Sequence, residues 1–366
     1  MWIESLECKN FRNYKNASVD FAPGVNFLYG DNAQGKTNLL EAVYLCSTSK
    51  SHKGSKDREL IFFGEKEAHV RLTLQKKGVA HKIDLHIRTS KGKGVAINGF
   101  PIRKASELYG FLNVVVFSPE DLFIVKNGPS DRRRFIDREL CQISGLYMKT
   151  LSDYNKVLNQ RNKLLKELPG KESLKDTLDV WDEQLVFYGE KVIKDRNRFL
   201  AEMTDTMKPL HSQLTGGKEK ISLKYEPSVL ETNFAEQLLV ARERDCILQQ
   251  TSVGPHRDDF SILVNDVNIR QFGSQGQQRS AALSLKLSEI SMIKKVTGEM
   301  PVLLLDDVFS ELDSHRQEYL LSEIKDTQTI LTGTGLDDLI TQNIKIDRLF
   351  YVKEGTVSFI DKKREA

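Results

Sequence analysis

The chain of 366 residues has few cysteines and tryptophans and no long apolar run. Its four cysteines, Cys8, Cys46, Cys141 and Cys246, are far apart and form no Cys-x-x-Cys pair. This spacing argues against a zinc site or a disulfide framework and predicts buried thiols in a reducing compartment. No apolar run approaches the roughly 18 residues of a membrane-spanning helix, and the first residues lack the apolar segment of a secretory signal. We therefore expect a cytoplasmic protein without membrane association.

The balance of charge does not indicate a partner by itself. The formal net charge is only +3, so an argument for nucleic acid must rest on clusters of basic residues. With 39% hydrophobic and 29% charged residues the composition is that of a folded globular protein. The length exceeds the usual size of a single compact core, which predicts two lobes.

The most informative stretch lies between an apolar, strand-like run at 25–29 and a helix-like segment at 38–46. It comprises Gly30, Asp31, Asn32, Ala33, Gln34, Gly35, Lys36 and Thr37. This fits the G-x-x-x-x-G-K-[ST] pattern, in which backbone N–H groups at a helix N-terminus surround phosphate. We expect all of these residues to bind ATP, with Lys36 on the β- and γ-phosphates and Thr37 on Mg²⁺.

A second stretch places two carboxylates after the apolar run 302–305. In P-loop NTPases such a strand brings one aspartate to the metal shell, so Asp306 is predicted to support Mg²⁺. The next residue, Asp307, is positioned to orient an attacking water or to accept its proton. Because the phosphate loop and this strand are far apart in sequence, the residues between them are an insertion into one α/β sheet.

The inserted residues have a helical period. Two apolar stripes, at 146–168 and 177–207, have steps of three and four residues and predict two helices that pack antiparallel. An earlier helix opens near 130, with Ser130 or Asp131 as the N-cap. The predicted domains are 1–122, the N-terminal part of an ATPase head; 123–250, a helical arm; and 251–366, the C-terminal part of the head.

A second potential anion site precedes the predicted helix 280–294. The segment 273–279 offers the Ser274 hydroxyl, Gly276 for close approach, Gln277 and free helix N–H groups. One nucleotide does not need two such sites from the same chain. We therefore expect Ser274 to act on the γ-phosphate bound by another copy, which makes ATP part of a homodimer interface.

The order of these motifs, followed by Ser310, Glu311, Leu312 and Asp313, resembles the ABC-type ATPase head shared by the structural-maintenance-of-chromosomes (SMC) proteins. Within that group the chain resembles the RecF family of bacterial recombination and replication-repair ATPases. The matching stretches are 10–14, 30–37, 50–61, 117–122, 128–137, 254–259, 273–279 and 304–312.

The resemblance implies an α/β fold, an ABC-type P-loop ATPase head with an inserted α-helical arm. It implies an ATP-dependent DNA-binding clamp in recombinational repair and replication restart, which dimerises on ATP and is released by slow hydrolysis. Such a clamp helps to load recombinase at single-strand gaps with the mediators RecR and RecO. The resemblance also suggests that Arg12 contacts phosphate.

Three positions depart from the family pattern. Many ABC heads have glutamate where this chain has the shorter Asp307, which fits weak hydrolysis used as a switch. No histidine occurs in 329–335, where many ABC ATPases have one, so Thr332 or Thr334 would substitute for it. Lys53 stands where an arginine is common and cannot make a bidentate fork.

Basic residues suited to the phosphates of duplex DNA and gap junctions are Arg132 and Arg133 near the arm root and Lys91 and Lys93 near a hairpin tip. A solvated charged face is the alternative for each cluster. The stretch 256–259 is interpreted as a structural turn and not as a metal site. The alternative function is a P-loop phosphotransferase whose helical segment is a substrate lid, in which case 273–279 has no role in catalysis.

Overall fold

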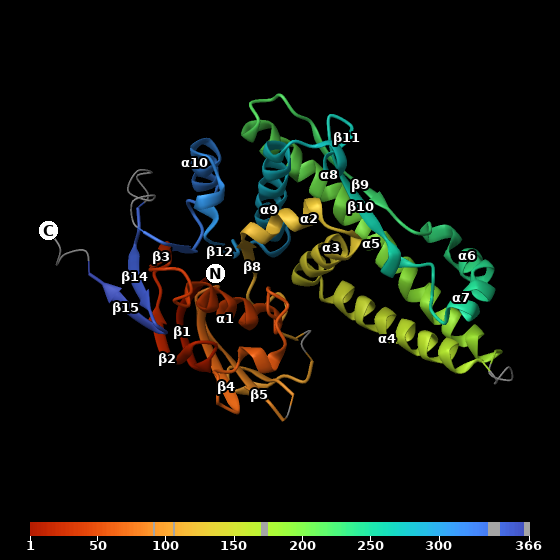
Figure 1. Ribbon diagram of the computed structural model, residues 1–366, viewed down its shortest axis with the longest axis horizontal. Helices are drawn as coiled ribbons and strands as arrows, with labels where there is room; N and C mark the ends of the chain where they lie inside the picture. Colours follow the sequence, from red (N-terminus) through yellow and green to blue (C-terminus); the bar gives the residue numbers. More distant parts are fainter. Residues whose placement is uncertain (91, 105–106, 170–174, 336–344, 362–366) are drawn as a thin grey trace. The chain divides into compact units, whose positions relative to one another are not determined.

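The computed structural model describes residues 1–90, 92–104, 107–169, 175–335 and 345–361. The chain forms two compact units, each visible in Figure 1. The first unit contains 1–121 and 289–366, and the second contains 122–288. Residues 251–288, which we assign by function to the ATPase head, thus belong to the second compact unit. The functional division of the chain stays a prediction.

A largely parallel sheet forms the centre of the first unit. Its strand order is β15-β14-β3-β13-β12-β8, and only β15 runs antiparallel to its neighbour. The bounds are β3 Val25–Tyr29, β8 Val114–Phe117, β12 Val302–Asp306, β13 Thr329–Gly333, β14 Arg348–Lys353 and β15 Thr356–Ile360. The inner strands are buried on both faces, so they appear in the sequence as continuous apolar runs. The predicted strands at 25–29 and 302–305 are confirmed, whereas β15 was missed because it is only half-buried.

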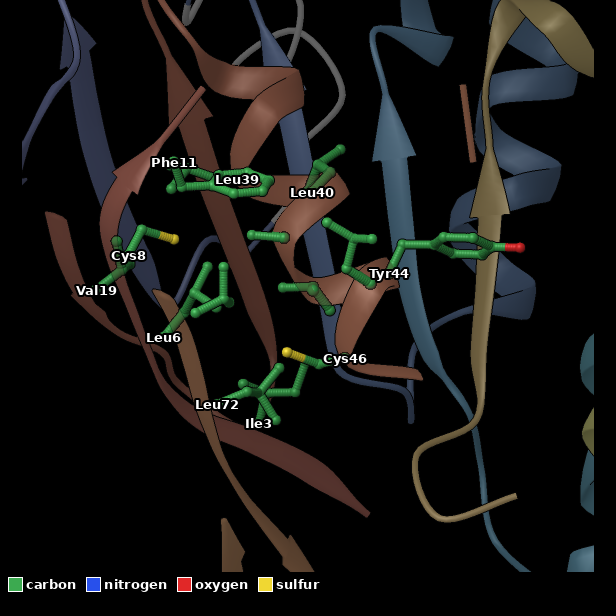
Figure 2. Packing of buried hydrophobic residues seen from close by; sticks show 14 of the residues in the cluster. Ile3, Leu6, Cys8, Phe11, Val19, Leu39, Leu40, Tyr44, Cys46 and Leu72 are labelled. Atoms are coloured by element: carbon green, nitrogen blue, oxygen red, sulfur yellow. The ribbon is translucent and has the colours of Figure 1, made fainter. Parts of the chain in front are cut away.

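The second sheet of this unit is antiparallel, with the order β2-β1-β4-β5-β6-β7. Its strands are β1 Trp2–Phe11, β2 Tyr14–Asp20, β4 Glu67–Lys76, β5 Val79–Arg88, β6 Gly94–Ile97 and β7 Phe100–Pro101. The helix α1 (Lys36–Thr48) contacts strands of both sheets. Figure 2 shows Leu39, Leu40 and Cys46 of α1 among buried residues of the antiparallel sheet, including Leu6 and Leu72. This packing fixes the helix that follows the phosphate loop.

Helices dominate the second unit. They are α2 Leu122–Lys126, α3 Pro129–Ile143, α4 Gly145–Glu167, α5 Thr177–Leu214, α6 Phe234–Val240, α7 Arg242–Leu248 and α8 Ile269–Phe272, followed by the start of α9 Gln275–Thr297. A three-stranded sheet, β11-β10-β9, is formed by β9 Ile221–Glu226, β10 Asp259–Val264 and β11 Val267–Asn268. The two longest arm helices, α4 and α5, lie side by side (Figure 1), as their apolar stripes predict. Among the helices of the described residues, none is long and apolar enough to cross a bilayer.

Three helix predictions were wrong in detail. The N-cap of α3 is Gly128, not Ser130 or Asp131, because Pro129 occupies the first helical position, where its missing N–H is not needed. Helix α5 continues past 207, through Pro209, to Leu214. The helix predicted at 280–294 begins five residues earlier, at Gln275.

The helix α10 (Ser314–Glu323) begins as its sequence suggests. The carboxylate of Asp313 accepts a hydrogen bond from the Arg316 backbone N–H at 3.0 Å and caps the helix. The four cysteines are free thiols, and three of them are buried, as expected from their spacing. Burial raises the pKa of Cys8 to about 12, so this thiol is a core residue.

Candidate nucleotide-binding site

The phosphate loop connects the end of β3 to the start of α1, and two glycines determine its path. Gly30 has φ +148° and Gly35 has φ +120°, a backbone region that L side chains rarely adopt. A Cβ on Gly30 would lie 2.2 Å from the Val352 carbonyl oxygen, and one on Gly35 would lie 2.6 Å from Nδ2 of Asn13. Both conformation and space therefore require glycine at these two positions.

Residues outside the motif hold the loop in place. Nδ2 of Asn13 donates to the Gln34 carbonyl oxygen at 2.8 Å, and the Glu354 backbone N–H donates to Oε1 of Gln34 at 2.7 Å. Sequence reasoning missed the contribution of the turn between β14 and β15. The Glu354-Gly355 pair is a turn signal that could have indicated this hairpin.

The ammonium group of Lys36 lies inside the loop. Its Nζ donates to the carbonyl oxygens of Gly30 and Asp31, the latter at 2.8 Å. Burial lowers the pKa of Lys36, and the nearby carboxylates of Asp307, Asp306 and Asp31 act in the opposite direction. A cation whose present partners are backbone carbonyls can exchange them for phosphate oxygens, which are stronger acceptors.

A chain of hydrogen bonds connects α1 to the ends of β12 and β13. The Thr37 hydroxyl donates to Oδ1 of Asp306 at 2.7 Å, and the Thr332 hydroxyl donates to the same oxygen at 2.9 Å. Thr332 also accepts from the Asp307 backbone N–H at 3.0 Å, and Asp307 has φ +52°. The parallel register pairs Asp306 with Thr332, so the sheet itself brings these side chains together.

These side chains fit a magnesium ion. Mg²⁺ is a hard cation that takes oxygen ligands, and in nucleotide sites it uses one or two protein oxygens besides phosphates and waters. The Thr37 hydroxyl and the Asp306 carboxylate supply such oxygens on two elements that already contact each other. Thr332 is one of the two residues predicted to replace the switch histidine, and its hydroxyl bonds the carboxylate of Asp306 and the backbone N–H of Asp307.

Arg12 is engaged with another residue of the same unit. Its guanidinium donates to both carboxylate oxygens of the buried Glu41, at 2.7 and 2.8 Å, and to the Glu59 carbonyl oxygen at 2.9 Å. Burial raises the pKa of Glu41, but hydrogen bonds from Arg12 and Ser51 outweigh it, and the net pKa lies below its usual value. A phosphate contact would draw Arg12 from this pair, and the contact stays a prediction.

The Ser274 segment starts α9 in the second unit with a reciprocal pair of hydrogen bonds. The Gln277 backbone N–H donates to the Ser274 hydroxyl at 3.2 Å, and the Ser274 backbone N–H donates to Oε1 of Gln277 at 3.0 Å. This is a capping box, with glutamine as the residue that reaches back. Ser274 is exposed at the surface of the unit. The roles of Ser274, Gly276 and Gln277 toward a nucleotide stay predictions.

Two of the residues predicted to contact DNA form ion pairs within the chain. The side chain of Arg132 is only 3% exposed, and its guanidinium binds both carboxylate oxygens of Asp259 at 2.6 and 2.8 Å. Lys93 is 10% exposed and donates to the Ser49 carbonyl oxygen and to Asp57, each at 2.7 Å. Both charges are thus paired within the chain, and a contact of either side chain with DNA stays a prediction.

The other two candidates differ from these. Arg133 is half-buried and donates to the Asp258 carbonyl oxygen at 2.6 Å, and burial lowers its pKa. Lys91 lies outside the described residues. Arg134, the next member of the same basic stretch, is 75% exposed and pairs with Asp131 one turn away. An exposed arginine of this kind remains accessible to a phosphate backbone.

The stretch 256–259 is a turn stabilised by its own side chains, as interpreted from the sequence. Nδ1 of His256 lies 2.7 Å from the Tyr154 hydroxyl, and its Nε2 lies 3.0 Å from the Thr251 carbonyl oxygen. Asp258 is buried and accepts from the Ser228 backbone N–H at 2.8 Å. In the part of the chain that the structure describes, no group of three or more His, Cys, Asp or Glu residues is arranged to hold a metal.

The fold and the loop geometry define a class of protein, the ABC-type P-loop ATPase heads. Residues 2–357 match the family model for the RecF/RecN/SMC N terminal domain. An SMC head bound to the C-winged helix domain of ScpA is 18% identical with a TM-score of 0.57, covering 98% of this chain and 97% of that one, a similarity of fold alone.

Two further relatives are much more similar. The DNA replication and repair protein RecF of Lachnoclostridium phytofermentans is 56% identical over 98% of this chain and 99% of its own. A solved structure of the recombination mediator protein RecF with ATP, in the RecFOR pathway, is 36% identical with a TM-score of 0.92 and covers 98% of each chain. The chain belongs to the RecF family.

Proposed function

We propose that this chain is an ATP-dependent DNA-binding clamp of recombinational repair and replication restart. ATP and Mg²⁺ bind at the loop from Gly30 to Thr37, two copies close on the nucleotide, and slow hydrolysis releases them. The closed pair holds duplex DNA near single-strand gaps and helps to load recombinase there together with RecR and RecO. The relatives described as DNA replication and repair proteins and as a mediator of the RecFOR pathway support this assignment.

The hydrogen-bonded chain from Thr37 through Asp306 to Thr332 and Asp307 is the observation that carries the proposal. It joins the phosphate loop to the carboxylates at the end of β12 within one unit. Bound Mg²⁺ would neutralise phosphate charge as it develops in the transition state. Thr37 and Asp306 are the residues that would hold it, and Lys36 would bind the β- and γ-phosphates.

Asp307 is the residue we assign to orienting the attacking water. It follows Asp306 directly, its backbone N–H is fixed by Thr332, and its carboxylate is close enough to Lys36 to raise the pKa of that lysine. The side chain is one methylene shorter than the glutamate of many ABC heads. A water held less closely would attack the γ-phosphate more slowly, which suits a switch that opens slowly.

The dimer is tested by light scattering with and without ATP. We expect a monomer without nucleotide and a dimer with ATP, and we expect Lys36→Met and Ser274→Arg each to remain monomeric. Ser274→Arg should still bind a fluorescent ATP analogue, because its own phosphate loop is intact. Ser152→Arg, which adds the same side chain at an exposed position of α4, is the control and should dimerise normally.

Mixing the two inactive variants gives a stricter test. A pair formed from Lys36→Met and Ser274→Arg contains one complete site, because the first supplies Ser274 and the second supplies the nucleotide. We expect this mixture to dimerise with ATP although neither variant does so alone. A mixture that stays monomeric, or a Ser274→Arg protein that dimerises normally, would refute the shared site and favour a phosphotransferase.

DNA binding is tested by filter binding of duplex DNA over a series of salt concentrations. Each neutralised phosphate contributes about −0.9 to the slope of log K against log salt. We expect a steeper slope with ATP than without it, because closure of two copies adds contacts. We also expect Arg134→Ala to reduce the slope by about 1 per protomer that contacts DNA. Binding that is independent of both ATP and salt would contradict the clamp.

A further inference from the structure

A buried histidine and a carboxylate connect the end of α5 to the start of α9, and neither belongs to a motif found in the sequence. Nε2 of His211 lies 3.1 Å from Oε2 of Glu219, and Nδ1 of His211 lies 3.0 Å from the Ser284 hydroxyl. The second oxygen of Glu219, Oε1, accepts from Nε2 of Gln277 at 3.1 Å. All four residues belong to the second unit.

These contacts fix which end of the Gln277 amide faces Ser274. Because Glu219 only accepts when ionised, Gln277 must turn its NH₂ group toward Glu219. Its Oε1 then faces the Ser274 backbone N–H, which donates to it at 3.0 Å. If the two ends of the Gln277 amide were exchanged, its oxygen would face the carboxylate of Glu219 and two acceptors would repel each other. The hydrogen bond from the Ser274 backbone N–H would also be lost. The carboxylate therefore selects the orientation that completes the capping box.

His211 holds Glu219 in that position. The imidazole is fully buried, so its conformation is set by packing as well as by its polar contacts, which also include the Ser280 backbone. With the proton on Nε2 it donates to Glu219, and its Nδ1 then accepts from the Ser284 hydroxyl. Ser284 lies on α9 two turns beyond Gln277. His211 therefore bonds the same helix whose first turn is bonded by Glu219.

We propose that Glu219, held by His211, is a positioning residue for the Ser274 segment. By fixing Gln277 it keeps the Ser274 hydroxyl and the first turn of α9 in the arrangement that a second copy's nucleotide needs. This inference rests on the proposed function of that segment in the ATP-dependent dimer. Glu219 itself does not contact nucleotide in the proposal, and it acts only through Gln277.

The test uses the full chain with Glu219→Ala, Glu219→Gln and the control Glu236→Ala. Glu236 is an exposed glutamate of α6, so its replacement removes the same charge from the same unit. We expect Glu219→Ala to bind the fluorescent ATP analogue as wild type does and to need at least about tenfold more protein for half-maximal dimerisation in saturating ATP. Glu236→Ala should match wild type in both measurements.

Glu219→Gln should recover most of the loss. A glutamine at 219 keeps an oxygen for the Gln277 NH₂ group, and its own NH₂ group can donate to Nε2 of His211 once the imidazole proton moves to Nδ1 and is donated to Ser284. General destabilisation would not be relieved in this selective way. If Glu219→Ala dimerises as wild type does, or if glutamine is no better than alanine, positioning by Glu219 is refuted.

Hydrogen exchange of the nucleotide-free protein separates this inference from the proposed function. The backbone N–H of Gln277 donates to the Ser274 hydroxyl. We expect this N–H to exchange about tenfold faster in Glu219→Ala than in wild type or Glu236→Ala. A wild-type chain that never dimerises with ATP would refute the shared site whatever the exchange result. Unchanged exchange in Glu219→Ala would refute the positioning role even when the wild type dimerises.

Discussion

Arg161 provides the most quantitative prediction, because its charge is completely buried among polar groups of three other segments. Its guanidinium donates to Asp182 of α5 at 2.5 Å, to Asp245 of α7 at 2.7 Å and to the Thr251 hydroxyl at 2.9 Å. Arg161 and Asp245 are both fully inaccessible to solvent. In the sequence Arg161 was only a polar interruption of the apolar stripe.

Replacing Arg161 by methionine keeps the aliphatic stem and removes the charge. Loss of one partner of a buried ion pair destabilises a protein by about 3–5 kcal/mol, because the remaining charge has no compensation. Asp182 retains Arg242 at 2.6 Å, so the unpaired charge is mainly that of Asp245. We therefore expect Arg161→Met to lower the free energy of unfolding by about 3 kcal/mol, a large share of the roughly 5–15 kcal/mol typical of a domain.

Urea unfolding followed by tryptophan fluorescence measures this loss. The chain's two tryptophans, Trp2 and Trp181, lie in different units, so a Trp2→Phe background leaves Trp181 of α5 as the reporter of the second unit. Arg198→Ala is the control, since Arg198 is 78% exposed and its solvent-screened pair with Glu202 should contribute little to stability.

A second substitution tests the cause of the loss. Asp245→Asn removes the unpaired charge, and its amide oxygen can still accept from the Ser252 backbone N–H, which bonds Asp245 at 2.9 Å. In the Arg161→Met background this change should restore about 1–2 kcal/mol, whereas alone it should destabilise. A loss below about 1 kcal/mol for Arg161→Met, or no recovery in the double variant, would refute the reasoning.

Three further predictions concern the loop, the carboxylates and pH. Gly35→Ala should abolish binding of a fluorescent ATP analogue, since a Cβ would overlap Asn13; wild-type affinity would contradict the loop geometry. Thr332→Val removes a hydroxyl bonded to Asp306 and Asp307 and should lower the steady-state ATPase rate at least about tenfold with ATP affinity retained, and an unchanged rate would exclude this role. Burial lowers the pKa of His256 from its ordinary value of 6.5 to about 4, so the unfolded chain binds a proton that the folded chain does not. The resulting stability is present above about pH 6.5 and is lost as pH falls toward 4, with a loss of up to about 3 kcal/mol. Burial raises the pKa of Asp258, and proton uptake by this group in the folded chain partly offsets the loss. Urea midpoints between pH 7 and 4.5 should fall less steeply for His256→Gln, and equal slopes would show that His256 is not responsible.

Local chemistry explains what could be predicted from the sequence. The spacing of Gly30, Gly35 and Lys36 determines a phosphate loop because only glycine adopts its backbone conformations. The apolar run before Asp306 determines a buried strand. Each of these depends on residues that are neighbours in the chain.

The charged groups whose roles the sequence did not reveal have partners that lie far along the chain. Arg132 was assigned to DNA because it stands in a basic run, but Asp259 and the packing around it bury the guanidinium. Glu219 and His211 belong to no sequence motif. Their role depends on contacts with α9, where Gln277 lies about sixty residues further along the chain. Sequence patterns report local conformation and which faces are apolar, and they do not identify distant polar partners.

The sequence by itself therefore determined the α/β class, the phosphate loop and the strand that ends at Asp306. The tertiary structure decided which charges are available to a ligand and which are used in ion pairs. The physical reason is that a charged side chain leaves water only when a specific partner compensates it, and that partner is supplied by the fold.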